Sequence, residues 1–168
     1  MNRLETIDGT SKYVSQRHQV LVLDGVQLDV LLDSARPDLN LLGLVPTLLD
    51  WLADPKERAL VWERILPPTG SIAVAPVLMC PDDCDLWCSV VVAEVSPVES
   101  IVWWRRVGLD MSKPQPEDMP KAIGGAVKWF SGLGPYCFDR AGYEECLASF
   151  KRPDAVQSAS ADRPGKQL

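Results

Sequence analysis

Residues 72–95 consist of IAVAPVLM (Ile72–Met79), CPDDCDLWC (Cys80–Cys88), one serine and VVVAEV (Val90–Val95). The two outer segments are rich in valine and other apolar residues, which is typical of buried β-strands. The segment between them holds three thiols and three carboxylates in nine residues, and its Pro-Asp-Asp sequence favours a turn. The stretch therefore predicts a β-hairpin that carries the Cys/Asp segment at its tip.

The β-rich pattern continues beyond this hairpin. Ile72–Cys80, Leu86–Val95 and Ile101–Val107 follow one another with short connections, which predicts three consecutive antiparallel strands. Alternation along the second strand puts Cys88 on the same face as Val90 and Val92, so we expect its thiol to point into the core.

Alternation also divides the side chains of the third strand between two faces. Trp103 and Arg105 should face one way, and Trp104 and Arg106 the other. One tryptophan is therefore expected in the core and the other at the surface or in an interface.

The residues before the hairpin predict mainly helices. Gln19–Leu23 is a predicted strand, and Leu28–Ala35 a helix, with a second hairpin strand as the alternative for the latter. The spacing of leucines in Leu41–Ala53 predicts a helix that Pro46 kinks or begins. A further helix is expected to start after Asp54 as its N-cap and to end near residue 66.

The residues after the meander predict a loop, a short strand and a helix. Asp110–Pro120 is polar and proline-rich, which is typical of a loop, and Ala126–Phe130 is a predicted strand. Asp139 can cap a helix whose apolar stripe should pack on the sheet. The members of that stripe are Tyr143, Cys146, Leu147 and Phe150.

Together these elements predict the α+β class. We expect a central antiparallel meander of about four to five strands, with N-terminal helices and a C-terminal helix packed on it. Residues 1–151 are expected to form a single domain, and residues 152–168 a flexible polar tail.

Charge and apolar patterning restrict the partners and the compartment. The 168 residues carry a net charge of −6, which argues against nucleic acid and favours a basic protein partner. Residues 1–13 lack the pattern of a secretory signal, and the apolar run Leu39–Leu52 is too short and too interrupted to cross a membrane. We therefore expect a cytoplasmic protein whose five cysteines are mostly free thiols.

The cysteines of the tip are candidate metal ligands. Cys80, Cys84 and Cys88 have C-x3-C-x3-C spacing, whereas a structural zinc site typically has C-x2-C or C-x4-C with a second ligand pair. The single histidine, His18, is far away in sequence and is expected at the surface. Cysteine as a small apolar residue of strands is the favoured interpretation, with no metal and no cofactor.

The carboxylates of the tip have two interpretations. Asp82, Asp83 and Asp85 can stabilise a turn by bonding nearby backbone N–H groups, or they can face the Lys and Arg side chains of a basic partner. In both cases we expect them to be at least partly exposed, because burying them without cations is costly. The candidate partner-binding residues are Asp82, Asp83, Asp85, Trp87, Trp103, Trp104, Glu117 and Asp118.

Several segments resemble one kind of bacterial protein. They are Pro76–Asp83, Val90–Glu94, Trp103-x-Arg105, Gly108–Asp110, Val127-x-Trp129-Phe130 and Tyr136-x-Phe138-Asp139. Together they are similar to small cytosolic immunity proteins of polymorphic-toxin and contact-dependent inhibition systems. The resemblance covers roughly residues 19–150 in size and pattern and supplies no binding residues. It implies a stoichiometric inhibitor of a toxin domain that has no enzymatic activity of its own.

Two other classes of function remain open at this point. A thiol- or metal-dependent enzyme would use Cys80, Cys84 and Cys88, and would bind stoichiometric metal or show unusual thiol titration. A self-associating regulatory domain would pair through exposed apolar strand faces.

Overall fold

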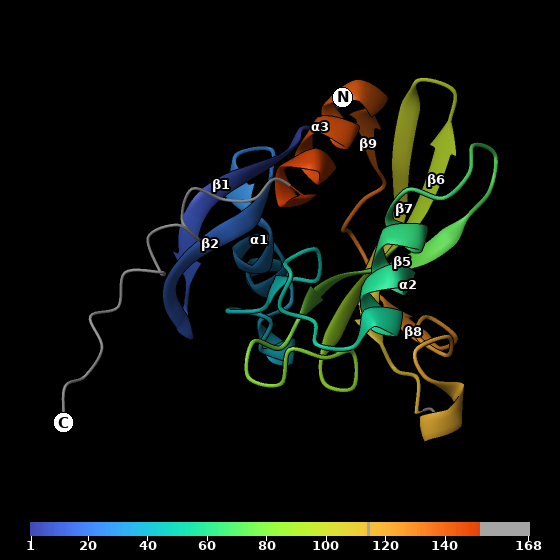
Figure 1. The fold of residues 1–168 in the computed structure, drawn as a ribbon. Helices are drawn as coiled ribbons and strands as arrows, with labels where there is room; N and C mark the ends of the chain where they lie inside the picture. The colour runs from blue at the N-terminus through green and yellow to red at the C-terminus, as the bar shows by residue number, and fades with distance from the viewer. Residues whose placement is uncertain (114, 152–168) are drawn as a thin grey trace, which may run out of the picture.

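Two antiparallel sheets and three α-helices make up the fold of residues 1–113 and 115–151, the part of the chain that the computed structural model describes (Figure 1). The predicted α+β class is confirmed. Residues 152–168, the predicted flexible tail, lie outside the described residues. None of the helices in the described part is long and apolar enough to cross a membrane.

The larger sheet contains the predicted meander. Its strands run in the order β4 (Val45–Pro46), β5 (Ala73–Met79), β6 (Val90–Val98), β7 (Ile101–Asp110) and β8 (Val127–Trp129). A further strand, β9 (Tyr136–Asp139), pairs with the first part of β7. Because β5, β6 and β7 pair antiparallel in chain order, the prediction of three consecutive strands is confirmed.

A β-bulge changes the faces of β7. Ala93 pairs with Val107 and Val95 with Trp104, so Arg105 and Arg106 together oppose the single residue Glu94. Arg106 is exposed and forms an ion pair with Glu94, so the predicted shared face of Trp104 and Arg106 is wrong. The extra residue breaks the alternation on which that prediction depended.

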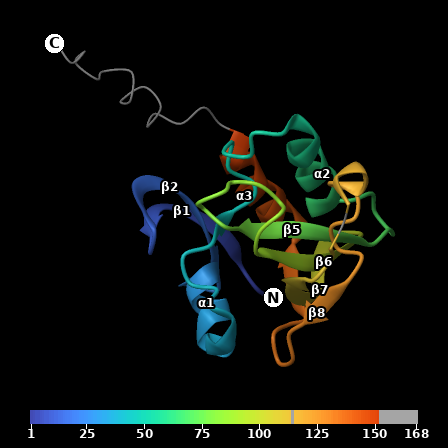
Figure 2. The same ribbon diagram turned by 90° about the horizontal axis from the view of Figure 1, so that it is seen from below.

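The smaller sheet was only partly predicted. It consists of β1 (Leu4–Ser11), β2 (Val14–Leu23) and the short β3 (Val26–Gln27), and α1 (Leu28–Ala35) follows directly. The predicted strand Gln19–Leu23 and the predicted helix Leu28–Ala35 are confirmed, although β2 is longer than expected. Figures 1 and 2 show this sheet beside the larger one, with α3 (Arg140–Lys151) in contact with both.

The predicted helix Leu41–Ala53 is wrong. After a short 3-10 turn, η1 (Pro37–Leu39), the chain turns at Gly43 with φ of +94° and then forms β4. Val45 pairs with Met79 and Pro46 with Leu78, and the Thr47 N–H donates to the Val77 carbonyl. Leu41, Leu44, Leu48, Leu49 and Leu52 are nevertheless buried, from the turns and irregular chain on either side of β4 rather than from a helix face.

The two longer helices match their predictions. The Asp54 side chain accepts a hydrogen bond from the Lys56 N–H and caps α2 (Pro55–Ile65), which packs on β5. The Asp139 side chain accepts from the Gly142 N–H at the start of α3. Of the predicted stripe, Tyr143, Cys146 and Leu147 are buried and Phe150 is half-buried. A second 3-10 turn, η2 (Pro116–Asp118), lies in the predicted loop.

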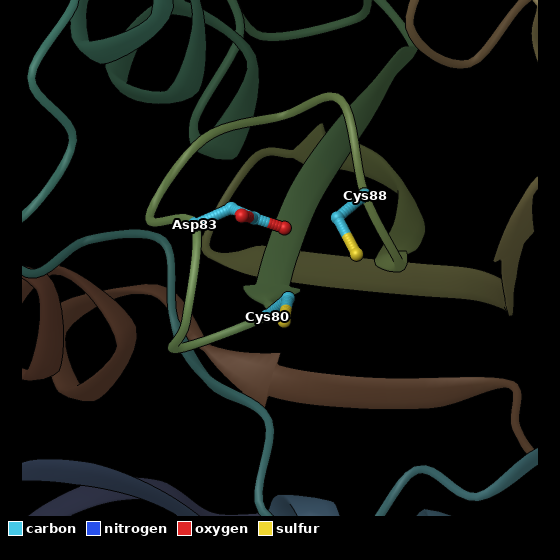
Figure 3. A group of neighbouring side chains, drawn as sticks. All are labelled: Cys80, Asp83 and Cys88. Carbon is cyan, nitrogen blue, oxygen red and sulfur yellow. The ribbon is translucent and has the colours of Figure 1, made fainter.

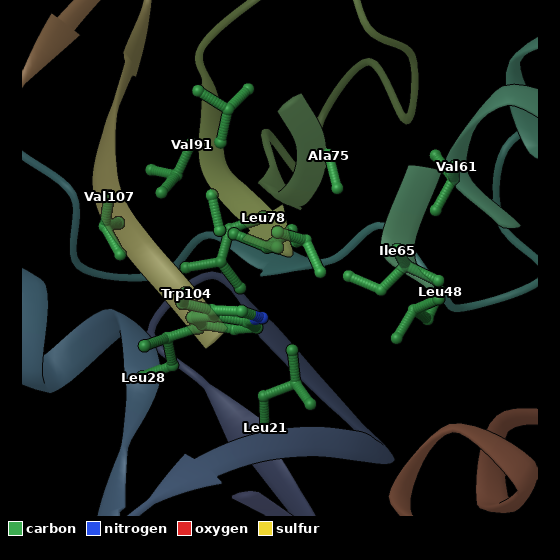
Figure 4. Close-up of a cluster of buried hydrophobic side chains, with 14 of the residues drawn as sticks. Leu21, Leu28, Leu48, Val61, Ile65, Ala75, Leu78, Val91, Trp104 and Val107 are labelled. Atoms are coloured by element: carbon green, nitrogen blue, oxygen red, sulfur yellow. The ribbon is translucent and has the colours of Figure 1, made fainter. Parts of the chain in front are cut away.

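One contiguous hydrophobic core joins both sheets (Figure 4). Trp104 of β7 is its largest fully buried side chain, and its indole N–H donates to the Tyr143 hydroxyl over 3.0 Å. That hydroxyl in turn donates to the Ile65 carbonyl over 2.8 Å. The strands, α2 and α3 are therefore joined by a satisfied polar contact inside the core.

Candidate functional site: the Cys/Asp loop between β5 and β6

The site is the connection between β5 and β6, residues 80–89, which we call the tip loop. Met79 and Val90 are paired in the sheet, so all ten residues between them belong to the loop. The prediction that strand begins at Leu86 is wrong, because the N–H groups of Leu86 and Trp87 bond carboxylates instead of a neighbouring strand.

The tip loop is held to the body of the protein by Leu86 and Glu57. The Leu86 side chain is 1% exposed and packs in the core. Its backbone N–H donates to Oε1 of Glu57 on α2 over 3.2 Å. Glu57 is itself buried, and its second oxygen, Oε2, has no partner among the described residues.

Burial also raises the pKa of Glu57. Desolvation raises the pKa of its carboxyl group, and the nearby charges of Asp85 and Asp54 act in the same direction. The hydrogen bond from the Leu86 N–H opposes this shift without cancelling it. Glu57, in the first turn of α2, therefore holds the loop through its hydrogen bond with the Leu86 N–H.

Hydrogen bonds within the loop fix its turns. The Cys84 N–H donates to the Cys80 carbonyl over 3.2 Å, and Cys84 has φ of +48°. The Trp87 N–H donates to Oδ1 of Asp85 over 3.0 Å. Of the three carboxylates, Asp85 thus has the turn-stabilising role that the sequence offered as one interpretation.

The other acidic residues and the tryptophan of the loop face solvent. Asp82 and Asp83 are exposed and Asp85 is half-buried, so the predicted exposure of these carboxylates is confirmed. Trp87 is 52% exposed. Cys88 is exposed as well, and the prediction that its thiol points into the core is wrong, because Cys88 precedes the first residue of β6.

Three side chains of the loop converge. The Sγ atoms of Cys80 and Cys88 and a carboxylate oxygen of Asp83 all lie within 4.8 Å of one another. Figure 3 shows the three side chains pointing toward one another across the loop. The sequence singled out Cys84 as the third member of such a group, but its thiol donates to the Pro81 carbonyl over 3.1 Å.

The surroundings of Cys84 and Cys88 raise the pKa of both thiols. The Ser89 backbone lowers the pKa of the Cys88 thiol, but burial and hydrogen bonds with Cys80 and Asp83 outweigh it, so the pKa is raised. Burial, followed by the charges of Cys80 and the three aspartates, raises the pKa of the Cys84 thiol. All five cysteines of the chain are free thiols.

The remaining predicted site residues lie elsewhere. Trp104 is fully buried and cannot contact a partner at the surface, so its place among the partner-binding candidates is wrong. Trp103 is half-buried and pairs with Ser96, six residues along β6 from the tip loop, or roughly 20 Å at the usual rise per residue. Glu117 lines a separate pocket of about 460 Å³ against α2, and Asp118 is exposed beside it.

Sequence reasoning missed two neighbours of the tip loop. Tyr13, at the turn between β1 and β2, packs on Gly43, where an added Cβ would lie 2.5 Å from its ring. Together with the loop these residues form a pocket of about 200 Å³. Its lining consists of Tyr13, Asn40, Leu42, Gly43, Leu44, Cys80, Pro81, Asp82 and Ser89.

His18 is also placed differently from its prediction. It is 6% exposed rather than at the surface, its ring lies 5.1 Å from that of Trp51, and Nδ1 donates to the Gln16 carbonyl. It is not part of the tip loop or of the converging group of side chains.

Comparison with models of protein families, with curated proteins and with solved structures gives no match.

Proposed function

We propose that this protein is a cytoplasmic protein-binding module, an immunity-type inhibitor that neutralises a basic toxin domain by stoichiometric binding through its tip loop. The observation that carries the proposal is the exposure of Trp87, Asp82 and Asp83 on one loop that buried contacts hold in place.

An exposed tryptophan on a fixed loop suits a protein interface. Tryptophan is enriched among the residues that contribute most to binding, where it enters a desolvated pocket of the partner. Because Leu86 is buried and bonded to Glu57, the loop loses little conformational freedom when a partner covers it. These properties favour a binding role for the loop over a role limited to connecting β5 and β6.

The negative charge of Asp82 and Asp83 in the tip loop favours a basic partner. None of the ion pairs among the described residues includes Asp82 or Asp83. Their charge adds to a net charge of −6, which would attract a basic domain over a distance set by ionic strength. The resemblance to immunity proteins suggests a toxin domain as that partner.

The test is co-purification of the protein with a basic toxin domain encoded by a neighbouring gene, followed by titration calorimetry. We expect a one-to-one complex, weakened more than about tenfold by Trp87→Ala. Asp82→Lys should slow association and reduce its salt dependence. Glu145→Lys, an equal charge change on the exposed side of α3, serves as the control and should bind like wild type.

Two outcomes would overturn the proposal. One is unchanged binding by both loop variants, which would place recognition elsewhere. The other is the absence of any complex with the toxin domain and of protection in cells, with sedimentation showing self-association instead; that result would favour the regulatory-domain alternative.

A further inference from the structure

We infer that Cys80, Asp83 and Cys88 form a binding site for one zinc ion. The inference rests on the convergence of these three side chains and is independent of the proposed function.

The distances suit a zinc ion. Ligand atoms at the corners of a tetrahedron around zinc lie about 3.5 to 3.8 Å apart, given bond lengths of about 2.0 Å to oxygen and 2.3 Å to sulfur. The two Sγ atoms and the carboxylate oxygen already lie within 4.8 Å of one another. A contraction of about 1 Å, within reach of side-chain rotation, completes the arrangement.

The chemistry of the three groups selects among metals. Thiolates favour zinc and other soft or borderline cations, whereas magnesium and calcium require sites built of oxygen ligands. Two thiolates and one carboxylate carry three negative charges when deprotonated, so a divalent cation compensates most of them. The site is therefore of the zinc class.

The fold holds two of the ligands in place before metal binds. Met79 pairs with Val90. Cys80 directly follows the last residue of β5 and Cys88 comes shortly before the first residue of β6, so both lie at the base of the loop. Asp83 reaches back toward them from the outer turn (Figure 3). That turn is maintained by the hydrogen bond between the Cys84 N–H and the Cys80 carbonyl and by the burial of Leu86.

Three protein ligands leave a fourth position of tetrahedral zinc open. Asp83 and Cys88 are exposed, so this position faces the solvent side of the loop. It would be filled by water or by a side chain of a bound partner.

The experiment uses the full-length, reduced and metal-free protein. Zn²⁺ is titrated in competition with a chromogenic chelator, and Co²⁺ is used as a spectroscopic probe. We expect one ion per chain, with a cobalt–thiolate charge-transfer band. Cys80→Ser, Cys88→Ser and Asp83→Asn should each weaken Zn²⁺ binding at least about tenfold.

Matched controls come from the same loop. Cys84→Ser and Asp82→Asn change a thiol and a carboxylate outside the converging group and should bind Zn²⁺ like wild type. Circular dichroism checks folding, and because Asp83 is exposed, Asp83→Asn keeps the test decisive if a cysteine variant unfolds.

Three results would overturn the inference. They are no stoichiometric Zn²⁺ binding by the reduced wild type, an equal loss of binding in Cys84→Ser, and unchanged binding in Asp83→Asn. A Cys80–Cys88 disulfide found by mass spectrometry without reductant, together with no Zn²⁺ binding after reduction, would assign the two thiols to redox chemistry instead.

Discussion

The two ends of β6 are connected in opposite ways. At one end Val98 pairs with Ile101, so Glu99 and Ser100 alone reverse the chain into β7. At the other end Met79 pairs with Val90, and ten residues make the same antiparallel reversal. Because two residues suffice for a hairpin, the length of the tip loop is not required by the topology.

The longer connection is nevertheless ordered by contacts with the body. Leu86 is buried, Glu57 accepts the Leu86 N–H, and the Asp85 side chain closes a turn. The short turn has no buried residue of its own, and its contacts are hydrogen bonds from Arg140 to the Glu99 and Ser100 carbonyls. A loop that is longer than its topology needs and is held by buried contacts is where binding residues are usually found.

The largest effect we predict is a difference in stability between variants of two neighbouring residues of the tip loop. Leu86→Ala should lower the free energy of unfolding by about 2 to 5 kcal/mol, because it leaves a cavity in the core. Trp87→Ala, which removes a half-exposed side chain, should change it by less than about 1 kcal/mol. Urea denaturation of both variants measures the difference.

The outcome decides whether the loop belongs to the folded core. Equal, small effects of Leu86→Ala and Trp87→Ala would mean that the loop is only loosely attached. The tip loop would then not be a fixed recognition surface, and the two connections of β6 would differ in length alone.

The second prediction concerns the buried support of the loop. The raised pKa of Glu57 means that the folded state binds more protons than the unfolded state between the ordinary and the raised glutamate values. The free energy of unfolding of wild type should therefore fall, relative to Glu57→Gln, as pH rises through that window. The slope is at most about 1.4 kcal/mol per pH unit.

Urea denaturation at a series of pH values measures this slope. Glu63→Gln, on the exposed side of the same helix, is the control and should keep the wild-type pH profile. Parallel profiles for wild type and Glu57→Gln would show that the pKa of this carboxyl group is the same in the folded and unfolded states.

Much of the larger sheet was predictable, because β5, β6 and β7 are rich in apolar residues and follow one another directly as strands along the chain. The bulge opposite Glu94 was not, since an extra residue leaves no trace in the pattern of Arg105 and Arg106. The strand β1 was missed because only Leu4 of its eight residues is buried, so it lacks the apolar alternation of a core strand. The environment of His18 was missed because it depends on Trp51, a residue distant in sequence whose ring lies 5.1 Å from that of His18.

The candidate site was found by composition but not by geometry. Three thiols and three carboxylates identified the tip loop, yet the metal alternative grouped Cys84, and not Asp83, with Cys80 and Cys88. Which side chains converge depends on the path of the loop, and that path depends on Glu57, 29 residues before Leu86 in the sequence. Such a contact between distant residues has no local sequence pattern.

The smallest effect we predict tests the short connection. Glu99 is the first residue of the two-residue turn and has φ of +51°, a conformation in which a Cβ is unfavourable and glycine is ordinarily found. Glu99→Gly relieves this cost but increases the freedom of the unfolded chain, which offsets part of the gain. We expect the free energy of unfolding to rise by about 0.5 kcal/mol. Ser100→Gly is the matched control: Ser100 lacks a positive φ, so only the unfavourable entropy remains and stability should fall by about 0.5 kcal/mol. If both variants are destabilised equally, the turn stores no strain at Glu99, and the two connections of β6 differ in length and side chains alone.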